Sequence, residues 1–96
     1  MGGKQVKLEE LIFKETGVRA FSHDGGLVYM VNRQEYVKIF RALRRVSRAY
    51  TVSRGVRGRR YKFYTKKGKI IMDVAEMMPS NIRKREPDYM VVIRGG

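Results

Sequence analysis

The sequence predicts one α+β domain, residues 1–96, in which helices pack on a mostly antiparallel sheet of about four to five strands. Ninety-six residues are enough for one small domain. Residues 33–47 have the apolar periodicity of a long amphipathic helix, and short β-like runs separated by glycine-containing turns occur on both sides of it. One or two short helices complete the prediction. Residues 1–4 and 94–96 are expected to be flexible ends.

The first thirty residues predict a short helix followed by a β-hairpin. Residues 8–12 place Leu and Ile at helical spacing, and Gly17 is expected to end that helix. Residues 18–21 and 27–31 are β-like runs. Asp24-Gly25-Gly26 between them is a turn signal, because glycine tolerates positive φ.

The long helix is expected to run from about Arg33 to Ser47. Asn32 can cap it, and Glu35 three residues later completes a capping box. At 100° per residue, one face is apolar and packs on the sheet: Tyr36, Ile39, Phe40, Leu43 and Val46. The opposite face is basic and lies in water: Lys38, Arg41, Arg44, Arg45 and Arg48.

Two strands and a turn should follow this helix. Residues 50–53 and 59–65 have strand character, and a basic loop, Arg54-Gly55-Val56-Arg57-Gly58, joins them. In the second strand Tyr61, Phe63 and Thr65 alternate with Arg60, Lys62 and Tyr64, which gives an aromatic face and a basic face. A turn is expected at residues 66–69.

The segment 70–78 fits two interpretations. Ile70, Ile71, Val74, Met77 and Met78 recur at helical spacing, and we favour a helix with Asp73 and Glu76 on its polar side. A strand that forms a hairpin with residues 59–65 is the alternative. Residues 80–88 are polar, and residues 89–93 predict a final buried strand.

The positive charge is concentrated in one block. The chain carries 22 Lys and Arg against 9 Asp and Glu, a net charge of +13. Residues 36–72 hold thirteen of those basic residues and no acidic one, so the rest of the chain is electrically balanced. A solvated surface normally mixes both signs, whereas a surface that binds a polyanion concentrates one.

This block supplies the candidate nucleic-acid-binding residues. Glycines in the 54–58 loop allow close approach, and arginine can fork onto phosphate oxygens. The expected partner is RNA or DNA, recognised through backbone and shape because no residue pattern predicts base readout. Tyr61 and Phe63 fit either stacking on bases or burial in the core. The site residues are Arg41, Arg44, Arg45, Arg48, Arg54, Arg57, Arg59, Arg60, Lys62, Tyr64, Lys66, Lys67 and Lys69.

Enzyme signatures are nearly absent, so we expect a non-catalytic protein. His23 is the only histidine, and the chain has no cysteine nucleophile. Asp73 and Glu76 could share a face and bind Mg²⁺, but a solvated face is the better interpretation. The 54–58 loop is neither a P-loop nor a dinucleotide-binding fingerprint. We therefore assign no catalytic, cofactor-binding or metal-binding residues.

Composition also bears on the cellular setting. The chain has no apolar run that could span a bilayer and no signal-peptide core, so no membrane partner is expected. With no cysteine, the cytoplasm, or a nucleoid or ribonucleoprotein within it, is the expected location. A composition with few Asn and Gln, no Cys and many Lys and Arg is typical of thermophilic proteins. An archaeal or viral origin fits these features.

From Leu27 onward, the expected order strand, helix, strand, helix, strand resembles the Alba family of archaeal chromatin and RNA-binding proteins. Residues 68–78, Gly-Lys-Ile-Ile-Met-Asp-Val-Ala-Glu-Met-Met, are similar to that family's second helix, and Pro87-Asp88 precedes the next strand. The resemblance covers residues 27–93. It implies nucleic-acid binding and a homodimer. Arg33 is the residue that could replace a DNA-contacting lysine of the family.

The C-terminal stretch is similar to that of ubiquitin-like β-grasp modifiers. Asn81-Ile82-Arg83-Lys84 followed by residues 89–96, which end in Arg-Gly-Gly, carries this similarity. It implies conjugation or thiocarboxylation at Gly96. A third hypothesis is a basic structural subunit of a ribonucleoprotein or viral particle, which would co-purify with one RNA or one protein.

Overall fold

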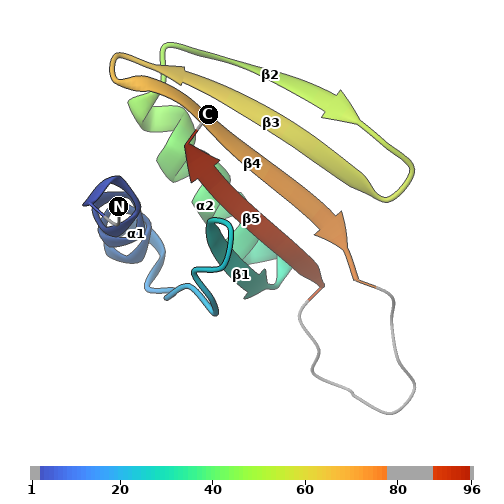
Figure 1. Ribbon diagram of the computed structural model, residues 1–96. Coiled ribbons are helices and arrows are strands. Elements are labelled where there is room, and N and C mark those ends of the chain that lie inside the picture. Colours follow the sequence, from blue (N-terminus) through green and yellow to red (C-terminus); the bar gives the residue numbers. More distant parts are fainter. Residues whose placement is uncertain (1–2, 78–87, 96) are drawn as a thin grey trace.

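Two helices lie on one face of a five-stranded sheet (Figure 1). The computed structural model describes residues 3–77 and 88–95. In chain order the elements are α1 (Gly3–Thr16), β1 (Leu27–Val31), α2 (Arg33–Val46), β2 (Ala49–Arg54), β3 (Gly58–Thr65), β4 (Gly68–Glu76) and β5 (Tyr89–Gly95).

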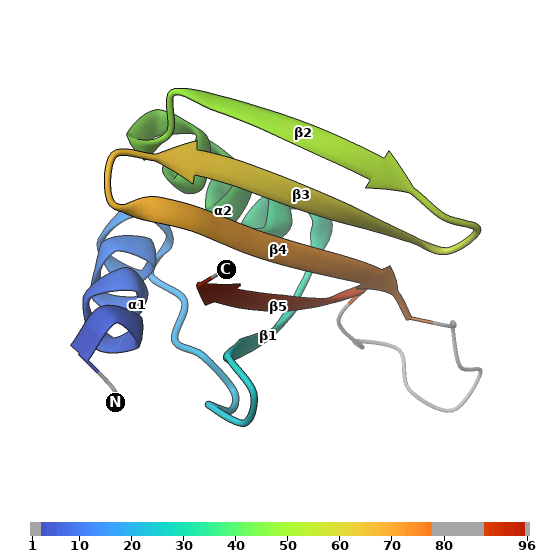
Figure 2. The same ribbon diagram turned by 45° about the horizontal axis from the view of Figure 1, so that its top comes forward.

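The sheet is antiparallel throughout, in the order β1-β5-β4-β3-β2. β2, β3 and β4 follow one another as hairpins. β5 then inserts between β4 and β1, the strand that is most distant from it in sequence. The first and last strands of the chain are therefore neighbours, and β2 forms one edge of the sheet (Figure 2).

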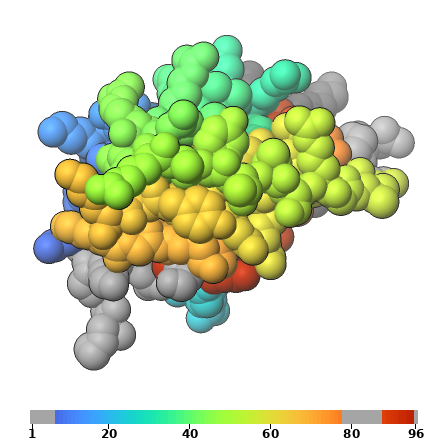
Figure 3. All heavy atoms as spheres, turned by 90° about the horizontal axis from the view of Figure 1, so that it is seen from above, coloured from blue at the N-terminus to red at the C-terminus, as the bar shows by residue number. Residues whose placement is uncertain are grey.

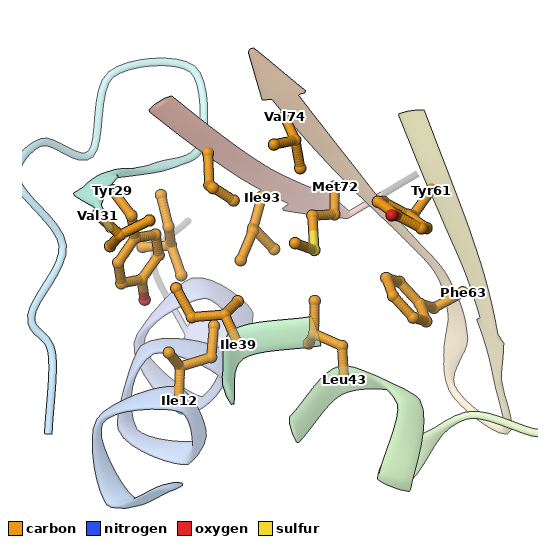
Figure 4. Close-up of a cluster of buried hydrophobic side chains, with 12 residues drawn as sticks. Ile12, Tyr29, Val31, Ile39, Leu43, Tyr61, Phe63, Met72, Val74 and Ile93 are labelled. Atoms are coloured by element: carbon orange, nitrogen blue, oxygen red, sulfur yellow. The ribbon is translucent and has the colours of Figure 1, made fainter. Parts of the chain in front are cut away.

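The core lies between the helices and the sheet face that they cover. Phe63, Met72 and Ile93 point from the sheet toward the helices and are fully buried (Figure 4). Ile39 and Leu43 of α2 meet them from the helix layer and are also fully buried. The core is therefore built from one face of every strand except the edge strand β2, which is exposed along its length.

The capping signals at the start of α2 form as expected. The Asn32 side-chain oxygen accepts a hydrogen bond from the Glu35 amide at 2.8 Å, and a Glu35 carboxylate oxygen accepts one from the Asn32 amide at 3.0 Å. This capping box satisfies backbone donors that the first helical turn leaves without partners. α2 begins at Arg33, as the sequence predicts, and ends at Val46.

The prediction of an α+β domain with an antiparallel sheet is confirmed in its general form. The prediction of one long helix beside one or two short ones is wrong. α1 and α2 each contain 14 residues. α1 extends back to Gly3 and includes residues that were expected at a flexible end, and β5 continues through Gly95.

The helix expected at residues 70–78 is also wrong over its described part. Residues 70–76 belong to β4, paired with β3 on one side and β5 on the other. Ile70, Met72 and Val74 alternate along β4 and pack toward the core, as strand periodicity requires. The apolar Ile71 and Ala75 lie on the other face, so the strict alternation of apolar and polar residues is lost and the segment also fits helical spacing. The segment that resembles the second Alba helix is thus a strand up to Glu76, and residues 78–87 lie outside the described residues.

The expected hairpin of residues 18–21 with 27–31 is reduced to an isolated bridge between Ser22 and Val28. The turn does form, with positive φ at Gly25 and Gly26. A Cβ on Gly26 would lie 2.7 Å from the Ile93 carbonyl oxygen, so glycine allows this loop to approach β5. β1 finds its main partner in β5.

Two buried tyrosines give a test of this core. The Tyr29 hydroxyl is buried and has no hydrogen-bond partner among the described residues, whereas the Tyr61 hydroxyl lies 2.8 Å from that of Tyr36. We expect Tyr29→Phe to leave the free energy of unfolding unchanged or to raise it by about 1 kcal/mol, because it removes an unsatisfied polar group.

The control, Tyr61→Phe, should lower that free energy by about 1 kcal/mol, because it breaks an existing hydrogen bond. Urea unfolding of both variants measures the difference. Equal destabilisation by the two substitutions would contradict the assignment.

Candidate nucleic-acid interface

α2 presents its arginines on two different flanks. Its buried stripe, with Ile39 and Leu43, fixes the rotation of the helix about its axis. On the flank toward β2, the Arg44 guanidinium lies 5.2 Å from the centre of the Tyr50 ring, within cation–π range. On the opposite flank, Arg45 forms an ion pair with Glu15 of α1 at 2.6 Å. Arg45 is therefore directed away from the other predicted site residues.

The hairpin of β2 and β3 carries a second group of arginines at its far end. Gly55 donates a backbone hydrogen bond to the Gly58 carbonyl at 2.8 Å and closes the loop that contains Arg57. A Cβ on Gly58 would lie 2.8 Å from the Val74 carbonyl oxygen, so glycine permits close packing on β4 here. Arg54 and Arg59 face each other directly across the two strands.

Side chains alternate along β3, so its cationic residues lie on both faces of the sheet. Arg59 lies on the helix side, together with Tyr61 and Phe63 of the same strand. Arg60 lies on the face away from the helices. Its guanidinium donates two hydrogen bonds to Asp73, at 2.6 and 3.3 Å, and Arg94 lies 3.3 Å from the same carboxylate. Asp73 thus offsets part of the charge on this face.

The thirteen predicted residues therefore do not form one patch. Six of them, which we call the α2–β2 surface, come from the outward face and the β2 flank of α2, the link to β2 and the β2–β3 hairpin: Arg41, Arg44, Arg48, Arg54, Arg57 and Arg59. Four lie on the sheet face away from the helices: Arg60, Lys62, Tyr64 and Lys69. Lys66 and Lys67 form the β3–β4 turn, and Arg45 lies toward α1.

Residues 36–72, the basic block without acidic residues, form one side of the molecule (Figure 3). Seen from above, α2, β2, β3 and the β3–β4 turn cover this side almost completely (Figure 3). Among the described residues, Arg41, Arg44 and Arg48 form no ion pair with an acidic side chain. The exposed Val52 and Tyr50 of β2 lie between these cations and those of the hairpin.

The aromatic residues of β3 have a structural role. Phe63 is fully buried and Tyr61 nearly so, and both rings lie against Phe40 of α2, with centroids 5.6 and 5.0 Å away. Neither ring can stack on a base, so burial in the core is the interpretation that holds. Tyr64 and Tyr50 are the exposed aromatic residues beside the cations, at 41% and 39% of their full exposure.

The β2–β3 hairpin extends past the start of α2 (Figure 2). Residues of both the hairpin and α2 line a groove there. Its volume is about 450 Å³. Its polar and aromatic lining comes from α2, β2, β3, β4 and β5: Arg33, Tyr36, Arg54, Arg59, Glu76 and Tyr89. Four of these six were not among the predicted site residues. In the sequence, the signal for Arg33 is that it could replace a DNA-contacting lysine in the resemblance to the Alba family. Glu76 and Tyr89 meet at the groove through the pairing of β4 with β5.

The protonation of Tyr36 follows from its surroundings at this groove. Burial, and then the hydrogen bond with Tyr61, raise the pKa of Tyr36 to about 12. Tyr61 is also within 3.4 Å of the Arg59 guanidinium, which donates to its hydroxyl. Two successive hydrogen bonds, between Tyr36 and Tyr61 and from Arg59 to Tyr61, therefore hold the Arg59 side chain in place at the groove.

Comparisons with known proteins give no relative. The chain matches no protein-family model, no curated protein and no solved structure with significance. Within residues 3–77 and 88–95, no helix is long and apolar enough to cross a membrane. In the same part of the chain, no three His, Cys, Asp or Glu residues are grouped as metal ligands would be.

The raised pKa of Tyr36 predicts a pH dependence. An unfolded tyrosine ionises near 10, so the folded chain holds this proton more tightly. The resulting stability is complete below pH 10 and is lost as the pH rises toward 12. We expect Tyr36→Phe to make the decline in unfolding free energy between pH 10 and 12 shallower than in the unaltered chain. Urea unfolding across this range measures it, and parallel curves would show that Tyr36 is not the group concerned.

Proposed function

We propose that this chain is a non-catalytic nucleic-acid-binding protein that contacts the phosphate backbone of RNA or DNA through the α2–β2 surface. The observation that supports this most strongly is the gathering of the acid-free block on one side of the molecule (Figure 3). Arg41, Arg44 and Arg48 there have no described acidic partner, so their charge is available to phosphates.

The dimensions of this surface suit several phosphates. α2 has 14 residues and β2 has six, which correspond to lengths of about 21 Å and about 20 Å. A duplex rises about 3.4 Å per base pair, so about six base-pair steps lie opposite a surface of this length. Several arginines can then contact phosphates at the same time.

The proposed mode of recognition is backbone contact rather than base readout in a groove. The basic flank of α2 lies beside β2 and is continuous with it, so α2 is not isolated as a reading helix would be. Arginine donates to phosphate oxygens in a fork, and the exposed Tyr50 beside Arg44 adds an apolar contact. Such contacts fix position on a nucleic acid without selecting a sequence.

The proposal predicts a steep salt dependence. If six to eight cations meet phosphates, the logarithm of the affinity for duplex DNA should fall with the logarithm of salt at a slope of about −5 to −7. Replacing Arg41, Arg44 and Arg48 together by alanine should reduce the size of that slope by about 2.7, because three phosphate contacts are lost. Fluorescence anisotropy with labelled duplex DNA at several salt concentrations measures both slopes.

The matched control replaces Lys7, Lys14 and Arg19, three exposed cations on or just after α1, with alanine. It changes the net charge equally but spares the α2–β2 surface, so its slope should stay near that of the unaltered chain. Equal slopes for the two triple variants would contradict the assignment of the phosphate contacts to the α2–β2 surface. Absence of salt-dependent binding to RNA and DNA would contradict the function itself.

A further inference from the structure

Three arginines line the groove at the start of α2, and none of them forms an ion pair with another described residue. Arg33, Arg54 and Arg59 reach it from three different elements. Glu76 also lines the groove, yet none of the three arginines forms an ion pair with it. Among the described lining residues, three guanidinium groups and one carboxylate give a net positive charge.

The arrangement of two of these arginines is unfavourable for the free chain. Because Gly55 donates to Gly58, the alternation of antiparallel pairing places Arg54 and Arg59 in a non-hydrogen-bonded pair. Residues in such pairs have Cα atoms about 4.5 Å apart and the closest side chains. Like charges directly opposite each other destabilise a sheet. A local conflict of this kind is typical of a functional site, and an anion held between the two arginines would relieve it.

Aromatic and apolar side chains also line the groove. The rings of Tyr36 and Tyr89 lie 4.9 Å apart, and both line the groove and are half-buried. Val74 of β4 lines it beside them. The volume of about 450 Å³ is within the range of sites for small organic ligands, about 300 to 1,000 Å³.

This combination fits a nucleotide better than a bare phosphate. Guanidinium groups bind the phosphate, aromatic rings receive the face of a base, and a carboxylate accepts hydrogen bonds from base amino groups. A base can reach such a site only when it is neither paired nor stacked within a duplex. The groove also adjoins the α2–β2 surface, with which it shares Arg54 and Arg59.

We propose that the groove binds one unpaired nucleotide of a single-stranded nucleic acid, with its phosphate on Arg33, Arg54 and Arg59 and its base against Tyr36 and Tyr89. This inference rests on the proposed function, because the strand that enters the groove is held by the α2–β2 surface. It adds a preference for single strands, which backbone contact alone does not give.

The test compares two single arginines of the same helix. Arg33→Ala removes a groove residue, and Arg41→Ala removes a cation outside the groove. Affinities are measured by fluorescence anisotropy for an oligonucleotide of mixed sequence, as a single strand and as the duplex with its complement. We expect Arg33→Ala to weaken single-strand binding about tenfold more than duplex binding, whereas Arg41→Ala weakens both to a similar extent.

A second variant tests the base contact without a change of charge. Tyr89→Leu keeps an apolar side chain but removes the ring, and loss of one base–aromatic stack corresponds to roughly a tenfold loss of single-strand affinity. Duplex affinity and the salt slope should not change. Thermal unfolding of each variant confirms that it is folded.

The outcomes separate the two proposals. If single-strand and duplex affinities fall in parallel for both Arg33→Ala and Tyr89→Leu, the groove does not bind a nucleotide, while the proposed function stands. If the unaltered chain binds neither form of nucleic acid, the proposed function fails first. Selective loss of single-strand affinity in both variants would support nucleotide binding in the groove.

Discussion

The contact of Phe40 with the sheet determines where the candidate binding surfaces of this molecule lie. Its ring touches those of Tyr50, Tyr61 and Phe63, with centroids between 5.0 and 5.6 Å away, and so joins α2 to both β2 and β3. The buried Leu43 lies one turn further along the same helix. This packing fixes the rotation of α2, and the arginines beside Phe40 are consequently held next to the edge of the sheet.

The same contact accounts for the groove. α2 crosses the sheet with its first turn near β1, while the β2–β3 hairpin extends beyond the cover that the helix provides (Figure 2). Where the helix no longer covers the sheet, Val74, Tyr89, Arg54 and Arg59 line the groove. The α2–β2 surface and the groove are therefore two parts of one arrangement.

Local sequence signals predicted the elements that depend on local interactions. They include the capping box at Asn32, the strands expected at 50–53 and 59–65 and observed at 49–54 and 58–65, and the turn at 66–69. All of these involve residues close together in the chain. β4 was not identified in this way, because the apolar Ile71 and Ala75 on its outer face obscure the alternation of Ile70, Met72 and Val74 on its core face. The insertion of β5 between β1 and β4 joins segments some sixty residues apart, and no short-range pattern contains that information.

The candidate site shows the same division. The charge block was visible in the sequence, and so was the helical stripe with Arg41 and Arg44. Because side chains alternate along a strand, Arg59 and Arg60 lie on opposite faces of the sheet. The fold then places Asp73 beside Arg60, where the two side chains form hydrogen bonds. Glu76 and Tyr89 join Arg33 only through the pairing of β4 with β5 and the position of α2. That these residues lie close together depends on the tertiary structure and is not visible in the local sequence.

The edge strand β2 has a consequence of its own. All six of its residues are exposed, and its outer backbone groups have no strand beside them in the sheet. An edge of this kind invites pairing with other chains, which leads to aggregation. Arg48 before the strand, Arg54 at its end and Arg44 above Tyr50 place repulsive charge along that edge. We expect these like charges to oppose pairing between copies along β2, so neutral replacements there should lower solubility.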